Sequence, residues 1–147
     1  MVDQTPRDPL FEAIEALYFG YRGFTDRPDR ILERRGLGRV HHRILYFVGR
    51  NPDISVRGLL AILAVSKQAL NAPLRQLVEM HLIAVLPSAL DRRVKQLRLT
   101  EDGDRLEAEL TNTQMRLLQS AFDKAGKDAQ GGWLRVMAEL AAVERAG

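Results

Sequence analysis

One stretch of the chain, from Ser55 to Thr100, restricts the possible folds more than any other. It opens with two short helical segments of apolar periodicity, and Ser66 stands where the second begins. Two β-rich runs follow, Leu82–Leu86 and Val94–Leu99, joined by the basic loop PSALDRR. Helix, turn, helix and basic hairpin in this order predict a winged helix-turn-helix, a shape that fits the grooves of DNA.

The charge of the chain is concentrated on the same stretch. Residues 55–98 hold 7 basic and 2 acidic residues, a net charge of +5, whereas residues 99–147 hold 6 and 9, a net charge of −3. A local positive excess is what a phosphate-binding surface requires. A basic face that is merely solvated remains the alternative when charge is considered alone.

Composition narrows the class of protein and its compartment. The 147 residues, 46% hydrophobic and 28% charged, are typical of one soluble globular domain. The absence of cysteine excludes disulfides, thiolate metal sites and thiol-based redox sensing. No apolar run approaches the roughly 18 residues of a membrane span, and MVDQTPRDP lacks the apolar core of a signal peptide. We therefore expect a cytoplasmic protein that does not contact the membrane.

Outside the central stretch the pattern predicts helices. Asp8 and Pro9 suit the N-cap and first position of a helix that Gly23 is expected to end. A short helix opened at Pro28 should follow, and Asp53–Ile54 is a candidate short strand. Thr100 should cap a long helix whose first turn is acidic. The predicted helices outside the helix-turn-helix cover about 8–23, 26–35, 38–49, 101–125 and 132–144.

The first and last helices carry apolar faces that need a partner. In the first, Leu10, Phe11, Ile14, Leu17, Tyr18 and Tyr21 recur at helical spacing, and in the last, Trp133, Val136, Met137, Leu140 and Val143 do so. Such a face must be buried against another element. We expect the two ends to pack together and against a second copy; folding onto their own domain is the alternative.

The central stretch resembles the MarR (multiple antibiotic resistance regulator) family of bacterial transcription factors. The segment SVRGLLAILAVSKQALNAPLRQLVEMHLI and the following DRRVKQLRLTEDG carry the resemblance, above all Asp91-Arg92-Arg93 ahead of Leu97-Arg98-Leu99-Thr100 and Gly103. The resemblance implies one domain over residues 1–147, mainly α with a small β-hairpin. Within it a winged helix-turn-helix at about 37–100 would be flanked by dimerisation helices at about 8–23 and 101–146.

The resemblance also implies which residues contact DNA. The helix that opens at Ser66 would be the recognition helix, with Lys67, Gln68, Asn71 and Arg75 on its exposed side; such side chains can pair with guanine and adenine in the major groove. In the family the wing aspartate holds the arginine that enters the minor groove. That role maps onto Asp91 and Arg93, and Arg57, Arg92 and Lys95 are phosphate candidates. A solvated helix face and an ordinary charged β-turn are the simpler interpretations.

Two residues depart from the family pattern. Pro73 stands inside the recognition helix, where it removes the bond to the carbonyl of Ala69. We predict a local distortion there, either a kink or a second N-cap at Asn71. His81 stands where glycine is common, in a turn that favours left-handed backbone, a region that histidine tolerates better than branched residues do.

Members of the family often bind small phenolic or aromatic acids between the dimer helices and the winged domain. Candidates for such a cavity are Tyr18, Tyr21, His41, His42, Phe47 and Trp133, with Arg39 or Arg43 as a carboxylate partner. Ordinary core packing and solvation are the alternatives. A metal site is not expected, because adjacent residues such as His41 and His42 diverge by about 100° on a helix.

The sequence does not indicate an enzyme, and no cofactor is expected. It has no glycine-rich phosphate loop or nucleophile-elbow motif, and helix capping explains the carboxylates at Glu101–Asp104. We therefore expect a dimeric regulator that binds a palindromic double-stranded operator, a repressor relieved by a small aromatic effector. A winged helix that contacts another protein without binding DNA is the alternative.

Overall fold

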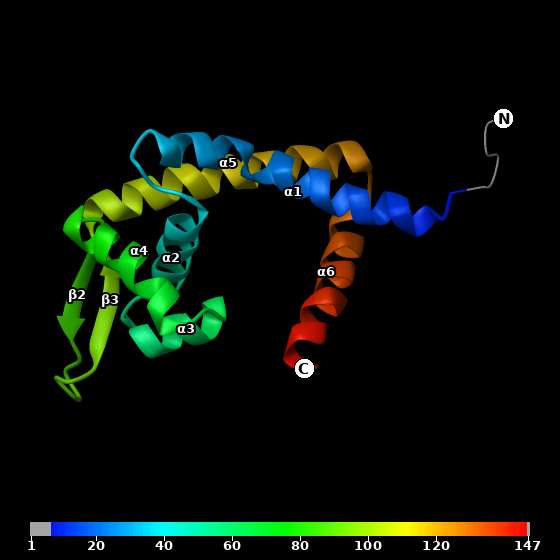
Figure 1. Cartoon of the computed structure of the whole chain (residues 1–147). Helices are drawn as coiled ribbons and strands as arrows, with labels where there is room; N and C mark the ends of the chain where they lie inside the picture. Colours follow the sequence, from blue (N-terminus) through cyan, green and yellow to red (C-terminus); the bar gives the residue numbers. More distant parts are fainter. Residues whose placement is uncertain (1–6, 147) are drawn as a thin grey trace.

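The computed structural model describes residues 7–146, so most of the N-terminal segment considered above for a signal peptide lies outside it. Figure 1 shows a helical chain with one small sheet. No helix within residues 7–146 is long and apolar enough to cross a membrane. The elements are, in order, α1 (Pro9–Glu33), α2 (Arg39–Arg50), β1 (Ile54–Ser55), α3 (Val56–Leu63), α4 (Lys67–Glu79), β2 (Ile83–Pro87), β3 (Lys95–Leu99), α5 (Glu101–Ala125) and α6 (Ala129–Ala146).

Residues 37–100, which we call the winged region, form the predicted helix-turn-helix and hairpin. The hairpin is antiparallel, with Ile83 opposite Leu99 and Pro87 opposite Lys95. The candidate strand also forms: β1 pairs with β3, Ile54 opposite Leu97, so the sheet has three strands in the order β1-β3-β2. The predicted fold class is confirmed, with this third strand added to the hairpin.

The core lies where the winged region meets the long helices. The helices α1 to α5 and the sheet all contribute fully buried leucines to it. Burying one such side chain stabilises a fold by about 1.5–3 kcal/mol. The fully buried leucines are Leu32, Leu45, Leu59, Leu70, Leu77, Leu82, Leu97 and Leu110. All core residues fall between positions 32 and 110, so one chain completes the core of the winged region without its ends.

The predicted break after Gly23 is wrong, because α1 runs without interruption from Pro9 to Glu33. Asp8 does cap it, accepting a bond from the Leu10 N–H at 2.9 Å. A helical glycine costs only about 1 kcal/mol, and Pro28 is buried inside the helix. The helical turn that follows Pro28 brings the Leu32 side chain into the core. Packing of the C-terminal part of α1 against the core therefore outweighs the local cost of Pro28, and the cost of Gly23 is too small to end the helix.

Several predicted turns and caps are confirmed. Ser55 and Ser66 cap α3 and α4, accepting bonds from Gly58 and Ala69 at 3.0 and 3.1 Å. His81 has left-handed backbone, with φ of +59°. Thr100 caps α5 through the Gly103 N–H at 3.0 Å.

Two hydrogen bonds and a close backbone approach hold the start of α5 against the start of β2. The Thr100 hydroxyl donates to the His81 carbonyl at 2.6 Å, and the Thr100 N–H donates to the Leu82 carbonyl at 3.1 Å. A Cβ atom on Gly103 would lie 1.9 Å from that same carbonyl oxygen. Only glycine fits there, which explains the glycine that follows the wing in the sequence.

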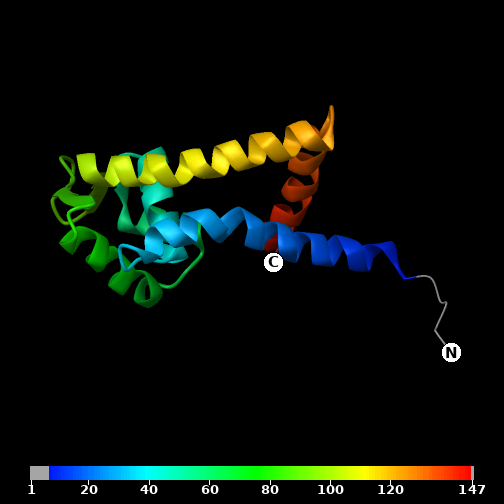
Figure 2. The same ribbon diagram turned by 90° about the horizontal axis from the view of Figure 1, so that it is seen from above.

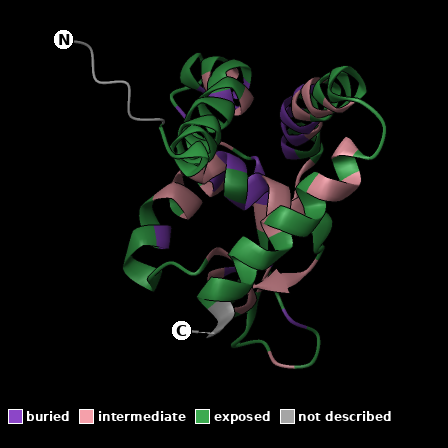
Figure 3. Cartoon of the chain, turned by 90° about the vertical axis from the view of Figure 1, so that its right-hand side faces the viewer, coloured by how far each residue is buried: buried purple, intermediate pink, exposed green. Residues whose placement is uncertain are grey.

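The two ends of the chain project away from this core. α1 and α5 contact each other and run side by side, and α6 leaves the far end of α5 at a steep angle (Figures 1 and 2). We call residues 9–21 of α1 together with α6 the arm. Its large apolar side chains are exposed, and both helices are mainly green in Figure 3. They include Leu10, Phe11, Ile14, Leu17, Tyr18, Phe19, Tyr21, Trp133, Leu134, Val136, Leu140 and Val143.

Candidate nucleic-acid interface and ligand cavity

Helix α4 presents one polar face to solvent. Its inner side is fixed by Leu70 and Leu77, which are 1% and 0% exposed. The opposite side carries the predicted donors and acceptors, and all of them are exposed: Ser66, Lys67, Gln68, Asn71 and Arg75. The Ser66 oxygen already accepts the Ala69 N–H, so its hydroxyl proton is the part left for another partner. The face can therefore offer amide and cationic groups to base edges and phosphates.

Of the two forms of distortion predicted at Pro73, the second N-cap at Asn71 is not found. α4 is continuous from Lys67 to Glu79, and Asn71 lies within it, so the alternative in which Asn71 begins a new helix is wrong. Pro73 still leaves the Ala69 carbonyl without its helical donor. Since Ala69 is exposed, water can bond to this carbonyl and the helix need not break.

The wing is organised by a single carboxylate. Asp91 accepts the Arg93 backbone N–H at 3.0 Å and its Nε and Nη2 at 3.2 and 3.3 Å. These side-chain and backbone bonds from Arg93 hold the pKa of the Asp91 carboxyl below its usual value. The Arg93 side chain nevertheless remains 90% exposed. Asp91 thus fixes the direction of a guanidinium that is still free to meet a phosphate or a minor groove.

Three more predicted cations lie exposed around these elements: Arg57 in the first turn of α3, Arg92 on the wing and Lys95 at the start of β3. Arg98 on β3 is committed otherwise, since its Nη2 pairs with Asp53 at 2.7 Å. The tip of the wing also presents Leu90, which is 99% exposed. The Leu90 N–H donates to the Ser88 hydroxyl at 3.2 Å, so this apolar side chain is held outward by an ordered loop.

A cavity of about 410 Å³ lies between α1, α2 and α5. Of the six predicted pocket residues it includes Tyr21, His42 and Phe47, and both candidate carboxylate partners, Arg39 and Arg43, line it as well. The lining residues that the sequence did not single out are Phe24, Thr25, Pro28, Asp29, Tyr46, Arg50, Thr111, Gln114, Met115 and Leu118.

The other three predicted pocket residues lie elsewhere. The Tyr18 ring packs against Phe19 and lies 5.7 Å from the Arg22 guanidinium. Trp133 packs against Phe122, with ring centroids 5.6 Å apart. His41 bonds to the α1–α2 turn and to α4 instead. In one chain these three residues do not line the cavity, because helical spacing does not tell which neighbour a face meets.

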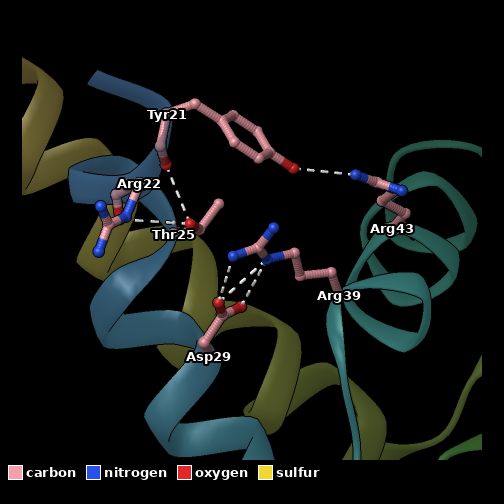
Figure 4. A network of polar contacts seen from close by, with 6 residues as sticks. All are labelled: Tyr21, Arg22, Thr25, Asp29, Arg39 and Arg43. Carbon is pink, nitrogen blue, oxygen red and sulfur yellow. Dashed lines mark hydrogen bonds and ion pairs between the residues drawn. The ribbon is translucent and has the colours of Figure 1, made fainter. Parts of the chain in front are cut away.

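The side chains at the mouth of the cavity are polar, and some of them form ion pairs or hydrogen bonds with one another. Figure 4 shows Arg39 held by Asp29 and the Tyr21 hydroxyl facing Arg43, with Nη2 to oxygen at 2.9 Å. The hydrogen bond that Arg39 donates to Asp29 raises the pKa of Arg39 above its usual value. Burial lowers the pKa of His42, on the cavity wall, below its usual value. The walls therefore offer cations, a neutral imidazole and aromatic rings, a combination suited to an anionic aromatic molecule.

One ion pair at the cavity, between the half-exposed Arg50 and a buried carboxylate, was missed by the sequence analysis. Glu107 of α5 is 2% exposed, and its Oε1 lies 2.6 Å from Arg50 Nη2. The Thr111 hydroxyl donates to the same oxygen at 3.1 Å. Glu107 stands one turn before Thr111 on the inner face of α5, so helical spacing from Leu106 and Leu110 would have placed it inside. Within residues 7–146, no three His, Asp or Glu side chains come together as metal ligands.

Known proteins share this sequence and this fold. The MarR family model matches residues 35–94. The HTH-type transcriptional regulator PetP of Rhodobacter capsulatus is 41% identical over 130 residues, 88% of this chain and 78% of that protein. Like the family, it is a regulator and not an enzyme.

Solved structures share the fold at low identity. Streptococcus pneumoniae FabT in complex with DNA superposes with a TM-score of 0.80 at 16% identity, covering 93% of this chain and 98% of that one. Staphylococcus aureus MarR in complex with salicylate and kanamycin superposes with a TM-score of 0.73 at 23% identity, covering 92% and 95%. With the PetP relative and the family model, they lead to one conclusion: the chain belongs to the MarR family of DNA-binding transcription regulators.

Proposed function

We propose that this protein works as a homodimer that binds a palindromic double-stranded operator and represses the adjacent genes until a small aromatic or phenolic acid enters the cavity. One observation carries the DNA part: Asp91 orients Arg93 while leaving it 90% exposed, next to an exposed polar face on α4. A fixed, solvated arginine on a hairpin suits a narrow minor groove, where negative potential is strongest.

The dimer is supported by the arm. Its apolar side chains are 41–71% exposed in one chain, on residues 9–21 of α1 and on α6, none of which belongs to the core. A concentration of exposed apolar side chains of this kind is typical of an association site. A twofold dimer would cover both arms and place two α4 helices for two half-sites of a palindrome.

The effector part is supported by the cavity. Its about 410 Å³ matches a small organic acid, and Arg39 and Arg43 offer charge at its mouth. Salicylate is bound in the Staphylococcus aureus relative of the same fold. A regulator of DNA acts where the chromosome lies, so the cytoplasm stays the expected compartment. The alternative of a winged helix without DNA is set aside because the family binds DNA.

The operator is tested by fluorescence anisotropy with a duplex that carries the palindrome upstream of the protein's own gene. We expect nanomolar affinity, as specific interfaces show at physiological salt, and at least 1,000-fold weaker binding to a scrambled duplex of equal length, about the lower limit of ordinary specificity. Equal affinity for the two duplexes would refute sequence-specific binding.

The effector is tested with salicylate as the probe. Calorimetry should show one site per chain in the wild-type protein and weaker binding by Arg43→Gln, which removes one charge from the cavity mouth. Arg135→Gln, on α6 and not in the cavity lining, is the matched control. Wild-type binding that Arg43→Gln leaves unchanged would place salicylate outside this cavity.

A further inference from the structure

The first turn of α2 touches the cavity on one side and the recognition helix on the other. Arg39 and His41 stand two residues apart in this turn. Arg39 reaches back to Asp29 on α1, at the cavity, whereas His41 reaches forward to Gln76 on α4. Through one helical turn the two side chains therefore connect α1 with α4. The residues that they reach, Asp29 and Gln76, lie 47 positions apart in the sequence.

On the cavity side the contact is an ion pair that a ligand can replace. Arg39 Nε and Nη2 lie 3.0 and 2.9 Å from Asp29 Oδ2, and the Arg39 guanidinium stacks 5.3 Å from the Tyr21 ring centroid (Figure 4). The Arg39 and Asp29 side chains are 47% and 26% exposed. A solvent-exposed ion pair of this kind contributes little to stability. A ligand carboxylate in the cavity presents the same acceptor as Asp29 and can compete for Arg39.

On the DNA side the contact is a directed chain of hydrogen bonds. The Gly38 N–H donates to His41 Nδ1 at 2.9 Å, so the imidazole must carry its proton on Nε2. That Nε2–H donates to Gln76 Oε1 at 2.9 Å, and Gln76 Nε2 donates to the Gly36 carbonyl at 3.2 Å. The Gln76 amide is thus held at its oxygen by the first turn of α2 and at its nitrogen by the turn between α1 and α2.

Gln76 follows Arg75, one of the exposed residues on the face of α4 that would meet DNA. The core leucines of α4 supply most of its binding to the rest of the protein, but apolar contacts are not directional. The Gln76 amide bonds are directional: one comes from His41 in α2 and the other goes to the carbonyl of Gly36, which has a φ of +71°. A displacement of the first turn of α2 therefore changes the orientation of α4 without exposing its core.

We propose that the first turn of α2 transmits the state of the cavity to the recognition helix: release of Arg39 from Asp29 by an anionic aromatic ligand moves the turn, and the His41–Gln76 bond passes that movement to α4. This coupling rests on the proposed function, since it gives the cavity ligand its effect on DNA. His41 and Gln76 are positioning residues that need not contact either ligand or DNA.

A double-mutant cycle tests the coupling without any ligand. Asp29→Ala frees Arg39, and Gln76→Leu removes the polar link while keeping a side chain of similar size. We expect Asp29→Ala to weaken binding to the operator duplex by about fivefold or more, the lower end of ordinary coupling between sites. In the Gln76→Leu background the same substitution should change affinity by less than about twofold, because the link is already cut.

The matched control is Asp26→Ala. It removes the same charge from the same helix, where Asp26 pairs with Arg30 at 2.6 Å outside the cavity lining. It should change affinity by less than about twofold in both backgrounds. Equal effects of Asp29→Ala in the two backgrounds would overturn the coupling, as would no effect in the wild-type background. A wild-type protein that fails to bind the duplex at all would instead refute the proposed operator.

A second measurement separates coupling from loss of fold. Long-range 1H–15N spectra of the imidazoles, with His41→Asn to assign the signal, should show His41 protonated on Nε2 alone. Asp29→Ala should shift this signal and Asp26→Ala should leave it in place, both in protein whose thermal melting remains cooperative. A His41 signal whose position is unchanged by Asp29→Ala would overturn the proposal without any measurement of DNA binding.

Discussion

The winged region and the arm use apolar side chains in opposite ways. In the winged region Leu59, Leu77 and Leu97 are fully buried, whereas in the arm Leu10 and Val143 are 69% and 71% exposed. Both patterns follow helical or strand periodicity in the sequence. The difference shows that one chain buries the apolar faces of the winged region and leaves those of the arm exposed. Periodicity predicts that a face is buried, but not whether its partner belongs to the same molecule.

The largest effect should come from placing charge on the arm. Ile14→Glu combined with Leu140→Glu puts four carboxylates into a twofold interface, each in place of an apolar side chain worth about 1.5–3 kcal/mol when buried. We expect a monomer in sedimentation velocity, unchanged helicity, and operator affinity reduced at least about 100-fold because two half-sites are no longer linked. Ile62→Glu, at a 42% exposed position on α3, should stay dimeric. A doubly substituted protein that remains dimeric would contradict the role of the arm.

Two helical glycines should respond with opposite signs. Gly103→Ala places Cβ against the Leu82 carbonyl oxygen at 1.9 Å, a backbone atom that cannot move aside. We expect a loss of about 3 kcal/mol or more in the free energy of unfolding. At Gly23 nothing lies within 4 Å, and alanine should stabilise α1 by about 0.5–1 kcal/mol. Urea titrations measure both, and a tolerated Gly103→Ala would show that the contact between α5 and β2 is looser than described.

Substituting a wing cation and substituting a base-contacting residue should affect DNA binding in different ways. Arg93→Glu should weaken binding about 10- to 100-fold on every duplex, since the wing contact depends on groove shape and charge. Asn71→Ala should instead lower the preference at one base pair by about 1–3 kcal/mol. Arg116→Glu on α5 carries the same charge change as Arg93→Glu away from the wing and should have little effect. Substitutions of Arg93 and Asn71 that leave DNA binding unaltered would refute the assigned interface.

The smallest effect concerns pH. Because burial lowers the pKa of His42, the unfolded chain binds a proton more readily than the folded one below the ordinary histidine pKa of about 6.5. The contribution of His42 is therefore present above that pH and is lost as pH falls. His42→Gln should flatten the decrease in melting temperature between about pH 7 and pH 5 relative to the wild type. An unchanged slope would show that His42 is not the group responsible.

The sequence predicted the elements whose signals are local. Serine and threonine caps, the left-handed His81 and the pairing of Asp91 with Arg93 each depend on neighbours within a few residues, and each is found. The break expected near Gly23 and the second N-cap considered at Asn71 are not found, because helix breakers cost only a few kcal/mol. Packing of residues such as Leu32 outweighs that cost.

Contacts between distant segments were beyond what spacing can predict. The bond between His41 and Gln76 joins residues 35 apart, and the pair of Arg50 and Glu107 joins residues 57 apart. Nothing in the pattern of one helix states which residue of another it will meet. The same gap explains why Trp133 was expected at the cavity and instead packs on Phe122.

The salt dependence of operator binding tests the central claim most directly, that the exposed cations of two winged regions engage DNA phosphates together. Three phosphate candidates in each chain, Arg57, Arg92 and Lys95, make six in a dimer. Log affinity plotted against log salt concentration should then fall with a slope of about −5. A slope near zero would contradict DNA binding by this surface, and a slope of about half the expected value would contradict its use as a dimer.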